Sequence, residues 1–369
     1  MGKIDLFEGC LDKTTCIPKM SIFVAMILRT PSFYKDFKCL ADKCTDTCCA
    51  GWEVCVDERT MAKYAKVDGE FGNRLRENIE DGCFKLRLGD RCPFLDSRNL
   101  CEIYRHLGPE YLCDICREHP RFVEVYGDVM EKGIGLCCEE GVRLLLESTG
   151  VLDLEEREVD EPADEIPEEA MMARDAIFAE RDWMLGLLAS TAQGTAPARG
   201  ISPERALREG LHQTLDATSP DEPFPANPNQ ITDKVNLPDG EILAAWKNIL
   251  KAGESFGPAW DRALAKLDEM SQNLFSAIDG AKIVAYTLFR YYGKTLFDGD
   301  ALTKVKFAVF FWLVLKRFGC AFGTSKIDAV KLLSKQVEYS DEVMEILSQA
   351  FAEDPAFSVP SFHRMVDLI

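Results

Sequence analysis

Residues 37–52 read FKCLADKCTDTCCAGW and carry four cysteines. Eight more follow along the chain, so that twelve of the fifteen cysteines lie from Cys39 to Cys138. Thiolates at this density need an electrophilic partner, which is either other sulfur atoms or a metal. The loop shows little hydrophobic periodicity, as expected where metal–ligand bonds rather than apolar burial fix the backbone. We therefore predict that a cysteine-rich module organises the first part of the chain.

The bulk properties narrow the range of partners. The chain has 369 residues and a formal net charge of −19 at pH 7. This charge argues against broad binding to nucleic acid or anionic lipid, which requires a basic face. The apolar run at residues 22–28 is only seven residues long and lacks the small-residue cleavage site of a signal peptide. The run at residues 307–315 is about half as long as a membrane span requires. We expect a cytoplasmic protein with no nucleic-acid or membrane partner, in which residues 307–315 form a buried helix.

Composition divides the first half of the chain. Residues 1–25 hold Cys10 and Cys16 in no recognisable spacing, whereas Met26 opens a segment typical of a natural N-terminus. We therefore expect residues 1–25 to be a non-native extension. Residues 26–150 form the predicted cysteine-rich module, in which short strands and helices alternate between turn signals. Within it we predict a tight turn at residues 96–99, a hairpin about Gly127 and a helix at residues 139–147.

The histidines at positions 106, 212 and 363 are isolated in the sequence, and we expect each to be a structural or surface residue.

The second half of the chain has a different character. Residues 151–175 are rich in Asp and Glu and contain two prolines, a composition typical of an exposed acidic linker. From residue 176 to residue 369, amphipathic helical patterns alternate with breaks rich in Pro, Gly and Asp. The predicted fold class is mainly α (α+β), with a cysteine-rich metal-binding module followed by an all-helical domain.

Three states of the cysteines are conceivable. Disulfides are disfavoured in the cytosol, and the adjacent pairs Cys48–Cys49 and Cys137–Cys138 cannot bridge internally without strain. Structural zinc prefers paired knuckles, and only Cys113-x2-Cys116 has that spacing. An iron–sulfur cluster is favoured because thiolates from distant loops can hold it. Zinc stays open as the alternative metal.

Five spaced motifs carry a resemblance to a known family. They are F-x-C-x4-C-x-D-x-C-C-x-G-W at 37–52, V-D-x-x-T at 56–60, C-P-F-L-D-x4-C-x-I at 92–103, L-G-x-x-Y-L-x3-C-R-x-x-P-R at 107–121 and C-x-E-x-x-R-L at 138–144. In this order they resemble the flagellin lysine-N-methylase family over residues 26–147. The resemblance implies transfer of methyl groups from S-adenosylmethionine to lysine side chains of flagellin, with a cysteine-bound 4Fe-4S cluster.

The resemblance also selects metal-ligand candidates. Matched by position, they are Cys39, Cys44, Cys48, Cys49, Cys92, Cys101, Cys116 and Cys138. Cys113 and Cys137 fall where the family pattern tolerates other residues and are left out. Eight thiolates exceed the four that one cluster needs, so either a second metal is bound or some are small buried residues.

Methyl transfer to lysine requires a neutral amine, so the site must bury the lysine or supply a base. The acidic residues near the cysteine motifs are the candidate bases: Asp46, Asp57, Asp96 and Glu140. For Asp57, a helix cap is favoured over a role as the base. The candidate donor-binding residues are two arginines for its carboxylate and two aromatic residues for its adenine or sulfonium: Arg117, Arg121, Trp52 and Tyr111. Ion pairing and core packing are the alternative roles of these four.

Two functions from another class remain open beside the enzyme. One is a noncatalytic iron–sulfur or zinc module that binds a partner or transfers electrons. The other is a metal-supply protein. The enzyme interpretation expects flagellin as the protein substrate.

Overall fold

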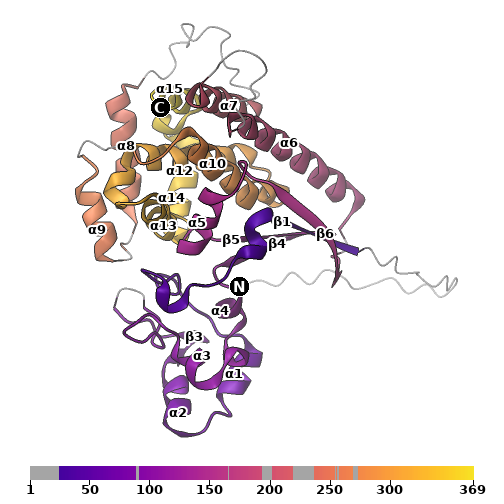
Figure 1. The fold of residues 1–369 in the computed structure, drawn as a ribbon, viewed down its shortest axis with the longest axis vertical. Coiled ribbons are helices and arrows are strands. Elements are labelled where there is room, and N and C mark those ends of the chain that lie inside the picture. Colours follow the sequence, from indigo (N-terminus) through magenta and orange to yellow (C-terminus); the bar gives the residue numbers. More distant parts are fainter. Residues whose placement is uncertain are drawn as a thin grey trace, which may run out of the picture.

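The computed structural model describes residues 25–88, 91–164, 166–192, 202–218, 237–253, 255, 257–268 and 273–369. Nearly all of the expected N-terminal extension, residues 1–24, lies outside these ranges. The described part is mainly helical with a four-stranded and a two-stranded sheet, which confirms the predicted fold class. Figure 1 shows a smaller lower lobe, made of early residues, beneath a larger helical body.

The helical body is built around α12 (Ala301–Phe322). Residues 305–315 of this helix are all buried, which confirms the buried helix expected at residues 307–315. α10 (Ala277–Tyr291) and α13 (Lys326–Val337) pack against it. The other helices of the body are α6 (Glu168–Ala192), α7 (Pro203–Ala217), α8 (Asp239–Ala252), α9 (Pro258–Ala265), α11 (Thr295–Asp298), α14 (Asp341–Glu353) and α15 (Val359–Asp367), with 3-10 turns η5 (Tyr292–Lys294) and η6 (Pro355–Phe357).

Serine and aspartate caps explain where several of these helices begin. The Ser276 and Asp279 side chains and backbones bond reciprocally at the start of α10, forming a capping box. Asp300, Ser325, Ser340 and Ser358 accept a backbone N–H at the starts of α12, α13, α14 and α15. Each cap satisfies a donor that the first helical turn leaves unpaired. Within the described ranges, no helix is both long enough and apolar enough to cross a membrane.

A four-stranded sheet lies at the base of the body (Figure 1), in the order β4-β5-β1-β6. β4 (Arg121–Tyr126) and β5 (Val129–Ile134) form the hairpin predicted about Gly127. β1 (Ala25–Pro31) pairs with β5 in parallel and with β6 (Leu154–Pro162) in antiparallel orientation. The sheet therefore joins strands from three separate parts of the chain.

β6 corrects the prediction of an acidic linker at residues 151–175. Its residues pair along the whole of β1, and α6 begins a few residues later. β6 is the edge strand of the sheet, and most of its side chains are exposed. Charged side chains on an edge strand prevent it from pairing with other chains. The acidic composition thus belongs to an exposed strand and not to an unstructured connection.

Buried polar contacts fix the sheet to the body. The Arg181 guanidinium on α6 binds both carboxylate oxygens of Glu131 on β5, at 2.6 and 2.8 Å, and neither side chain is more than 1% exposed. The Tyr286 hydroxyl on α10 donates to the Ile134 carbonyl at 2.7 Å and accepts its N–H at 2.6 Å. Because a buried charge without its partner is costly, the Arg181–Glu131 pair specifies how α6 lies on the sheet.

The lower lobe has a core of its own. It contains α1 (Glu58–Tyr64), α2 (Gly69–Glu77), β2 (Ile79–Glu80), β3 (Cys83–Phe84), α3 (Glu102–Leu107) and α4 (Asp114–Glu118). Its buried residues are Val54, Val56, Tyr64, Leu75, Phe84, Cys92, Phe94, Leu95, Ile103 and Cys113. By contrast, Val142 and Leu145 of α5 (Glu139–Glu147) belong to the core of the body. The lower lobe is thus an insertion between β1 and β4 of one sheet.

Candidate metal centre

The cysteine loop 37–52 is held by α13 of the helical body. The Lys335 ammonium lies 2.7 Å from the Asp46 carboxylate and also donates to the Thr47 carbonyl. The Lys331 ammonium donates to the Thr45 hydroxyl at 3.2 Å. The position of this loop is therefore set by residues that are far away in the sequence.

A pocket lies between this loop and the start of α5. Its lining residues are Cys39, Leu40, Cys44, Asp46, Thr47, Cys48, Cys137, Cys138, Glu139, Glu140 and Lys331. Five of them are cysteines, and we call these the pocket thiols: Cys39, Cys44, Cys48, Cys137 and Cys138. Sulfur ligands and carboxylates therefore face the same small space.

The pocket thiols contact one another and the surrounding polar groups. The Cys48 and Cys138 thiols both line the pocket and interact with each other. The Cys44 thiol donates to the Glu139 carboxylate over 3.4 Å. Burial raises the pKa of Cys44 to about 11 and that of Cys137 to about 12. Without a cation these thiols stay neutral, whereas a bound metal would deprotonate them.

A second group of thiols lies in the core of the lower lobe. Cys92 and Cys113 are buried there, and Cys101 and Cys116 pack against the same core. The Cys113 and Cys116 thiols interact with each other, and the thiols of Cys92, Cys101 and Cys116 interact electrostatically with Cys49. Ala50, next to Cys49, forms a β-bridge with Arg91, next to Cys92. We call these five cysteines the lobe thiols. Burial raises the pKa of Cys92 to about 12. By contrast, the neighbouring Cys48 lowers the pKa of Cys49 to about 7, and the neighbouring Cys116 lowers that of Cys113.

The spacing of the thiols bears on the type of metal. Thiolates on one tetrahedral zinc ion lie about 3.8 Å apart, because each Zn–S bond is about 2.3 Å. In the described ranges, only Glu53, Cys55 and Cys83 provide three ligand atoms that all lie within 4.8 Å of one another. Both thiol groups are therefore more widely spaced than a closed zinc site. Their all-sulfur donor set fits an iron–sulfur cluster, which spreads its ligands over several iron atoms.

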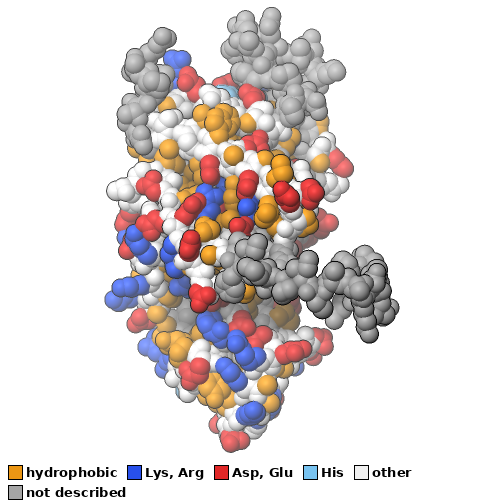
Figure 2. Space-filling model, turned by 90° about the vertical axis from the view of Figure 1, so that its right-hand side faces the viewer, with side chains coloured by type: hydrophobic (Ala, Val, Ile, Leu, Met, Phe, Trp, Pro, Cys, Tyr) orange, Lys and Arg blue, Asp and Glu red, His pale blue; other side chains and the backbone are white. Residues whose placement is uncertain are grey.

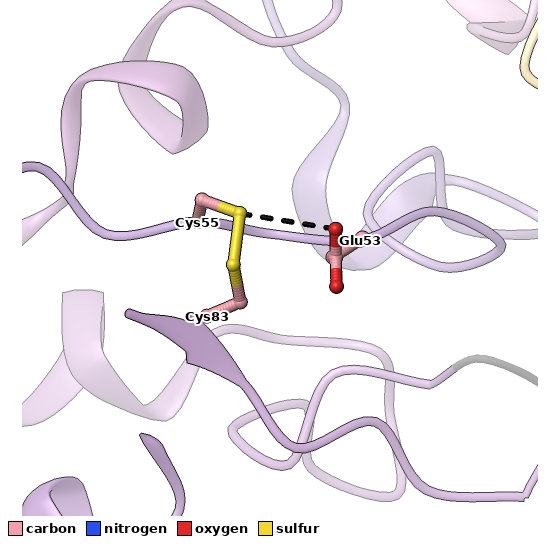
Figure 3. Close-up of side chains that lie close together, drawn as sticks. All are labelled: Glu53, Cys55 and Cys83. Carbon is pink, nitrogen blue, oxygen red and sulfur yellow. Dashed lines mark hydrogen bonds between the residues drawn. A yellow bond between two sulfur atoms is a disulfide. The ribbon is translucent and has the colours of Figure 1, made fainter. Parts of the chain in front are cut away.

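Cys55 and Cys83 form a disulfide, which corrects the expectation that the cysteines are not disulfide-bonded. Figure 3 shows Glu53 beside this bridge, with its carboxylate 3.9 Å from the Cys55 sulfur. Backbone hydrogen bonds join Phe84 to Val54 and bring the two cysteines opposite each other. Neither cysteine is among the ligand candidates.

The eight ligand candidates divide equally between the two groups. Four of them, Cys39, Cys44, Cys48 and Cys138, line the pocket. The other four, Cys49, Cys92, Cys101 and Cys116, are lobe thiols. The two cysteines that were left out also join the groups, because Cys137 lines the pocket and Cys113 lies in the lobe core. For Cys113, the Cys113-x2-Cys116 spacing was the signal in the sequence that pointed to this grouping.

Two of the candidate bases line the pocket. Asp46 pairs with Lys335, and Glu140 is 6% exposed and accepts two hydrogen bonds from Arg143, both of 2.7 Å. Glu139, which the sequence did not single out, also lines the pocket and accepts from the Thr45 hydroxyl at 2.6 Å. The pocket therefore offers three carboxylates.

The other two candidate bases lie outside the pocket lining and have structural roles. Asp57 caps α1 by accepting from the Thr60 N–H at 2.9 Å, and its second oxygen accepts from the Asp114 N–H at 2.9 Å. Asp96 accepts from the backbone N–H groups of Arg98 and Leu100, within the turn predicted there. Their carboxylates accept backbone N–H groups and so stabilise the local backbone conformation.

Each candidate donor-binding residue has a partner within the chain. The Arg117 guanidinium binds the Asp114 carboxylate at 2.8 Å, and that of Arg121 lies 4.9 Å from the centre of the Phe37 ring. Tyr111 packs against the lobe core. Trp52 stacks on His119 with ring centres 4.5 Å apart. The structure does not bring these four side chains to a common partner.

His119 has a role that the sequence did not indicate. Its Nε2 donates to the Cys48 carbonyl oxygen at 2.6 Å, and Trp52 Nε1 donates to the same oxygen at 3.0 Å. Burial lowers the pKa of His119 to about 4, so the ring is neutral at physiological pH. His119 and Trp52 together fix the peptide that links Cys48 to Cys49.

The histidines of the helical body are also not isolated. His212 on α7 and His363 on α15 face each other through Nδ1. Their Nε2 atoms lie 3.0 Å from Asp367 and 2.8 Å from Asp216, respectively. This corrects the view that each is a lone structural or surface residue.

Comparison with known proteins identifies relatives of the chain. The flagellar biosynthetic protein FliU of Salmonella muenchen is 30% identical over 138 residues, which cover 34% of this chain and 81% of that protein. The lysine-N-methylases of Salmonella choleraesuis SC-B67 and Salmonella typhimurium LT2 are 29% identical over 140 residues, which is 35% of this chain. The match spans only 35% of the length of each of these two methylases. No protein-family model and no solved structure matches.

Proposed function

Because this chain belongs to the family of the flagellar protein FliU and the lysine-N-methylases, we propose that it is a lysine N-methyltransferase. Its proposed donor is S-adenosylmethionine, and its proposed substrates are lysine side chains of flagellin. Two observations together support the proposal: the chain has relatives named lysine-N-methylase, and its pocket is lined by both thiols and carboxylates. The reaction would take place in the cytoplasm, where thiols are kept reduced.

The carboxylates of the pocket suit a lysine substrate. Asp46, Glu139 and Glu140 would attract a protonated lysine, and one of them would accept its proton before transfer. The neutral amine nitrogen then forms a bond to the methyl carbon as the bond between that carbon and the sulfonium sulfur breaks. The product ammonium releases a further proton, and S-adenosylhomocysteine leaves.

We assign the proposed 4Fe-4S cluster to the cysteine-rich region, with zinc as the alternative metal. The proposed ligands come from the eight candidates, of which Cys48 and Cys138 already contact each other. When bound, the cluster would supply thiolate-ligated iron that ties the cysteine loop to α5, so that ligation free energy also stabilises the fold. The lysines of α13 would hold the loop in place around it.

The proposal is tested by incubating anaerobically purified, metal-replete protein with flagellin and methyl-labelled S-adenosylmethionine. Mass spectrometry of digested flagellin should locate the label on lysine. Flagellin whose lysines have been chemically acetylated beforehand is the matched control and should stay unlabelled. Unlabelled lysine in the presence of fully metallated protein contradicts the enzyme proposal.

A noncatalytic metal module that binds a partner or transfers electrons is the second candidate. It is favoured by the intramolecular partners of Arg117, Arg121, Trp52 and Tyr111, which leave no assembled donor site among these four. Reversible one-electron reduction of a protein that transfers no methyl group would support it. A colourless protein with only stoichiometric zinc would contradict the iron–sulfur assignment in both candidates.

A further inference from the structure

We infer that the cysteine-rich region holds two separate metal centres and that the adjacent residues Cys48 and Cys49 belong to different ones. The pocket thiols hold one centre and the lobe thiols hold the other. This inference rests on the metal-binding part of the proposed function, but not on methyl transfer. It also departs from the ligand set implied by the family resemblance, because it includes Cys113 and Cys137.

The contacts of the two adjacent cysteines differ. Cys48 interacts with Cys137 and Cys138, at the start of α5. Ala50, the residue after Cys49, forms a β-bridge with Arg91, the residue before Cys92, which places Cys49 beside the lower lobe. The thiols of Cys92, Cys101 and Cys116 interact electrostatically with Cys49. The two groups meet at the vicinal pair, whose thiols interact with each other. One peptide bond thus connects two sets of sulfur ligands.

The number of thiols supports two centres. One cluster needs four thiolate ligands, whereas there are five pocket thiols and five lobe thiols, the latter being the four in the lobe core together with Cys49. A single centre would leave six thiols unused, including Cys113, which is 1% exposed and lies with Cys116 in the lobe core. Two centres use both groups and leave one cysteine over in each.

The two groups also lie in different packing environments. The pocket thiols lie where the cysteine loop meets α5 and α13 of the body, with Lys331 in the pocket lining. The lobe thiols lie in a core of only ten buried residues, which is small for an independently stable unit. Small lobes of this kind commonly depend on disulfides or metals, and this one already has the Cys55–Cys83 bridge. A metal among the lobe thiols would complete its stabilisation.

The peptide between the two groups is held by two side chains. Trp52 and His119 both donate to the Cys48 carbonyl oxygen, at 3.0 and 2.6 Å. His119 is in turn packed against Tyr339, which follows α13, with ring centres 5.8 Å apart. Residues from the lobe side and from the body therefore position the connection between Cys48 and Cys49.

The test compares two double variants of the full chain, purified without oxygen. The pocket variant carries Cys44→Ser and Cys138→Ser, and the lobe variant carries Cys113→Ser and Cys116→Ser. Each leaves at most three thiols in its group, so the fifth cysteine cannot restore four-thiolate ligation. Iron and zinc per chain are measured together with Mössbauer and visible spectra. Cys320→Ser, on α12, is the control outside both groups.

The wild-type protein should contain metal for two centres. Each double variant should lose one centre and keep the spectrum of the other, and the quadruple variant should lose both. If the lobe centre is zinc, the lobe variant loses zinc alone; if it is iron–sulfur, both variants lose iron. The emission of Trp246, Trp260 and Trp312, which are buried in the body, should stay unchanged and shows that the body remains folded.

Two results would overturn the inference. One is metal for only a single centre in the fully reconstituted wild-type protein. The other is loss of the same metal from both double variants, with no further loss in the quadruple variant. Methyl transfer does not enter these measurements, so a failure of the enzyme proposal leaves the metal counts unaffected.

Discussion

Asp57 shows how an acidic residue beside the cysteine motifs can have a structural role. Both of its carboxylate oxygens accept backbone N–H groups, one from Thr60 and one from Asp114. Burial acts to raise its pKa, but these hydrogen bonds outweigh burial and lower the pKa to about 2. The charged form of Asp57 therefore stabilises the lobe by tying α1 to the start of α4.

Replacing Asp57 with Ala should destabilise the lower lobe by about 1–2 kcal/mol, because a helix cap and a second hydrogen bond are lost. Urea denaturation with the metal bound measures this loss. Asp68→Ala is the matched control, because Asp68 stands at the start of α2 without a side-chain cap bond. An equal loss in both variants would contradict the assigned role.

The same carboxylate predicts a pH dependence. Its folded pKa lies below the ordinary value of 3.8, so its stabilisation is fully present above that value and is lost as the pH falls towards about 2. The difference in urea midpoint between the wild-type protein and the Asp57→Asn variant should therefore shrink from pH 5 to pH 2. A difference that stays constant over this range would exclude a role for the charge.

The three other candidate bases differ in whether they line the pocket. Asp46→Asn and Glu140→Gln change carboxylates that line the pocket, whereas Asp96→Asn changes one that binds its own turn. Replacing the residue that acts as the general base should lower kcat about 10²–10⁴-fold. We expect this for Asp46 or Glu140 and not for Asp96. Full activity in both pocket variants would move the base to Glu139 or to the solvent.

At the scale of elements, α13 connects the helical body to the cysteine loop. Lys331 and Lys335 lie four residues apart on α13 and so face the same side, and Tyr339 follows the helix. The two lysines bind Thr45, Asp46 and Thr47, and the Tyr339 hydroxyl contacts the Cys137 thiol. A helix remote in sequence thus supplies positive charge near the pocket thiols, and the residue Tyr339 that follows it supplies a hydroxyl group.

Replacing Lys331 or Lys335 with Met should lower the reduction potential of a cluster at the pocket, on the order of tens of millivolts. The reduced cluster carries one more negative charge, which the ammonium groups stabilise. Redox titration followed by electron paramagnetic resonance measures the shift. Lys326→Met is the control on the same helix, because Lys326 pairs with Asp279 of α10 at 2.6 Å instead. An equal shift in the control would exclude a local effect.

At the scale of the whole molecule, the lower lobe and the body have separate cores. The lobe is inserted between two strands of the sheet that the body covers (Figure 1). Figure 2 shows acidic and basic side chains interspersed over the lower part of one face. Because the contacts between lobe and body centre on the cysteine loop, perturbing the lobe core should leave the body largely unaffected.

Replacing Cys55 and Cys83 together with Ala should destabilise the lobe by about 2–4 kcal/mol, because their bridge closes a loop with a sequence separation of 28. Hydrogen exchange should accelerate in α1 and α2 but not in α12. Cys320→Ala is the control for loss of a thiol in the body. Equal acceleration in α12 would contradict the separation of the two cores.

Local signals were sufficient for several elements. The predicted helix at residues 139–147 has the observed bounds of α5, and the hairpin about Gly127 is formed by β4 and β5. Caps, hydrophobic periodicity and turn residues act over a few positions and can be read directly. β1 and β6 were missed because their pairing partners lie far away in sequence, and the charged face of β6 has the composition of a linker.

The sequence by itself determined the number and spacing of the cysteines, the mainly helical fold class and the motifs that carry the family resemblance. Only the tertiary structure decided that the thiols form two groups, that Asp46 and Glu140 face the pocket while Asp57 and Asp96 do not, and that α13 holds the cysteine loop. The physical reason is that residue type and spacing are local properties. The convergence of side chains, by contrast, depends on how distant segments pack, and burial and hydrogen bonding then assign each carboxylate and thiol its role.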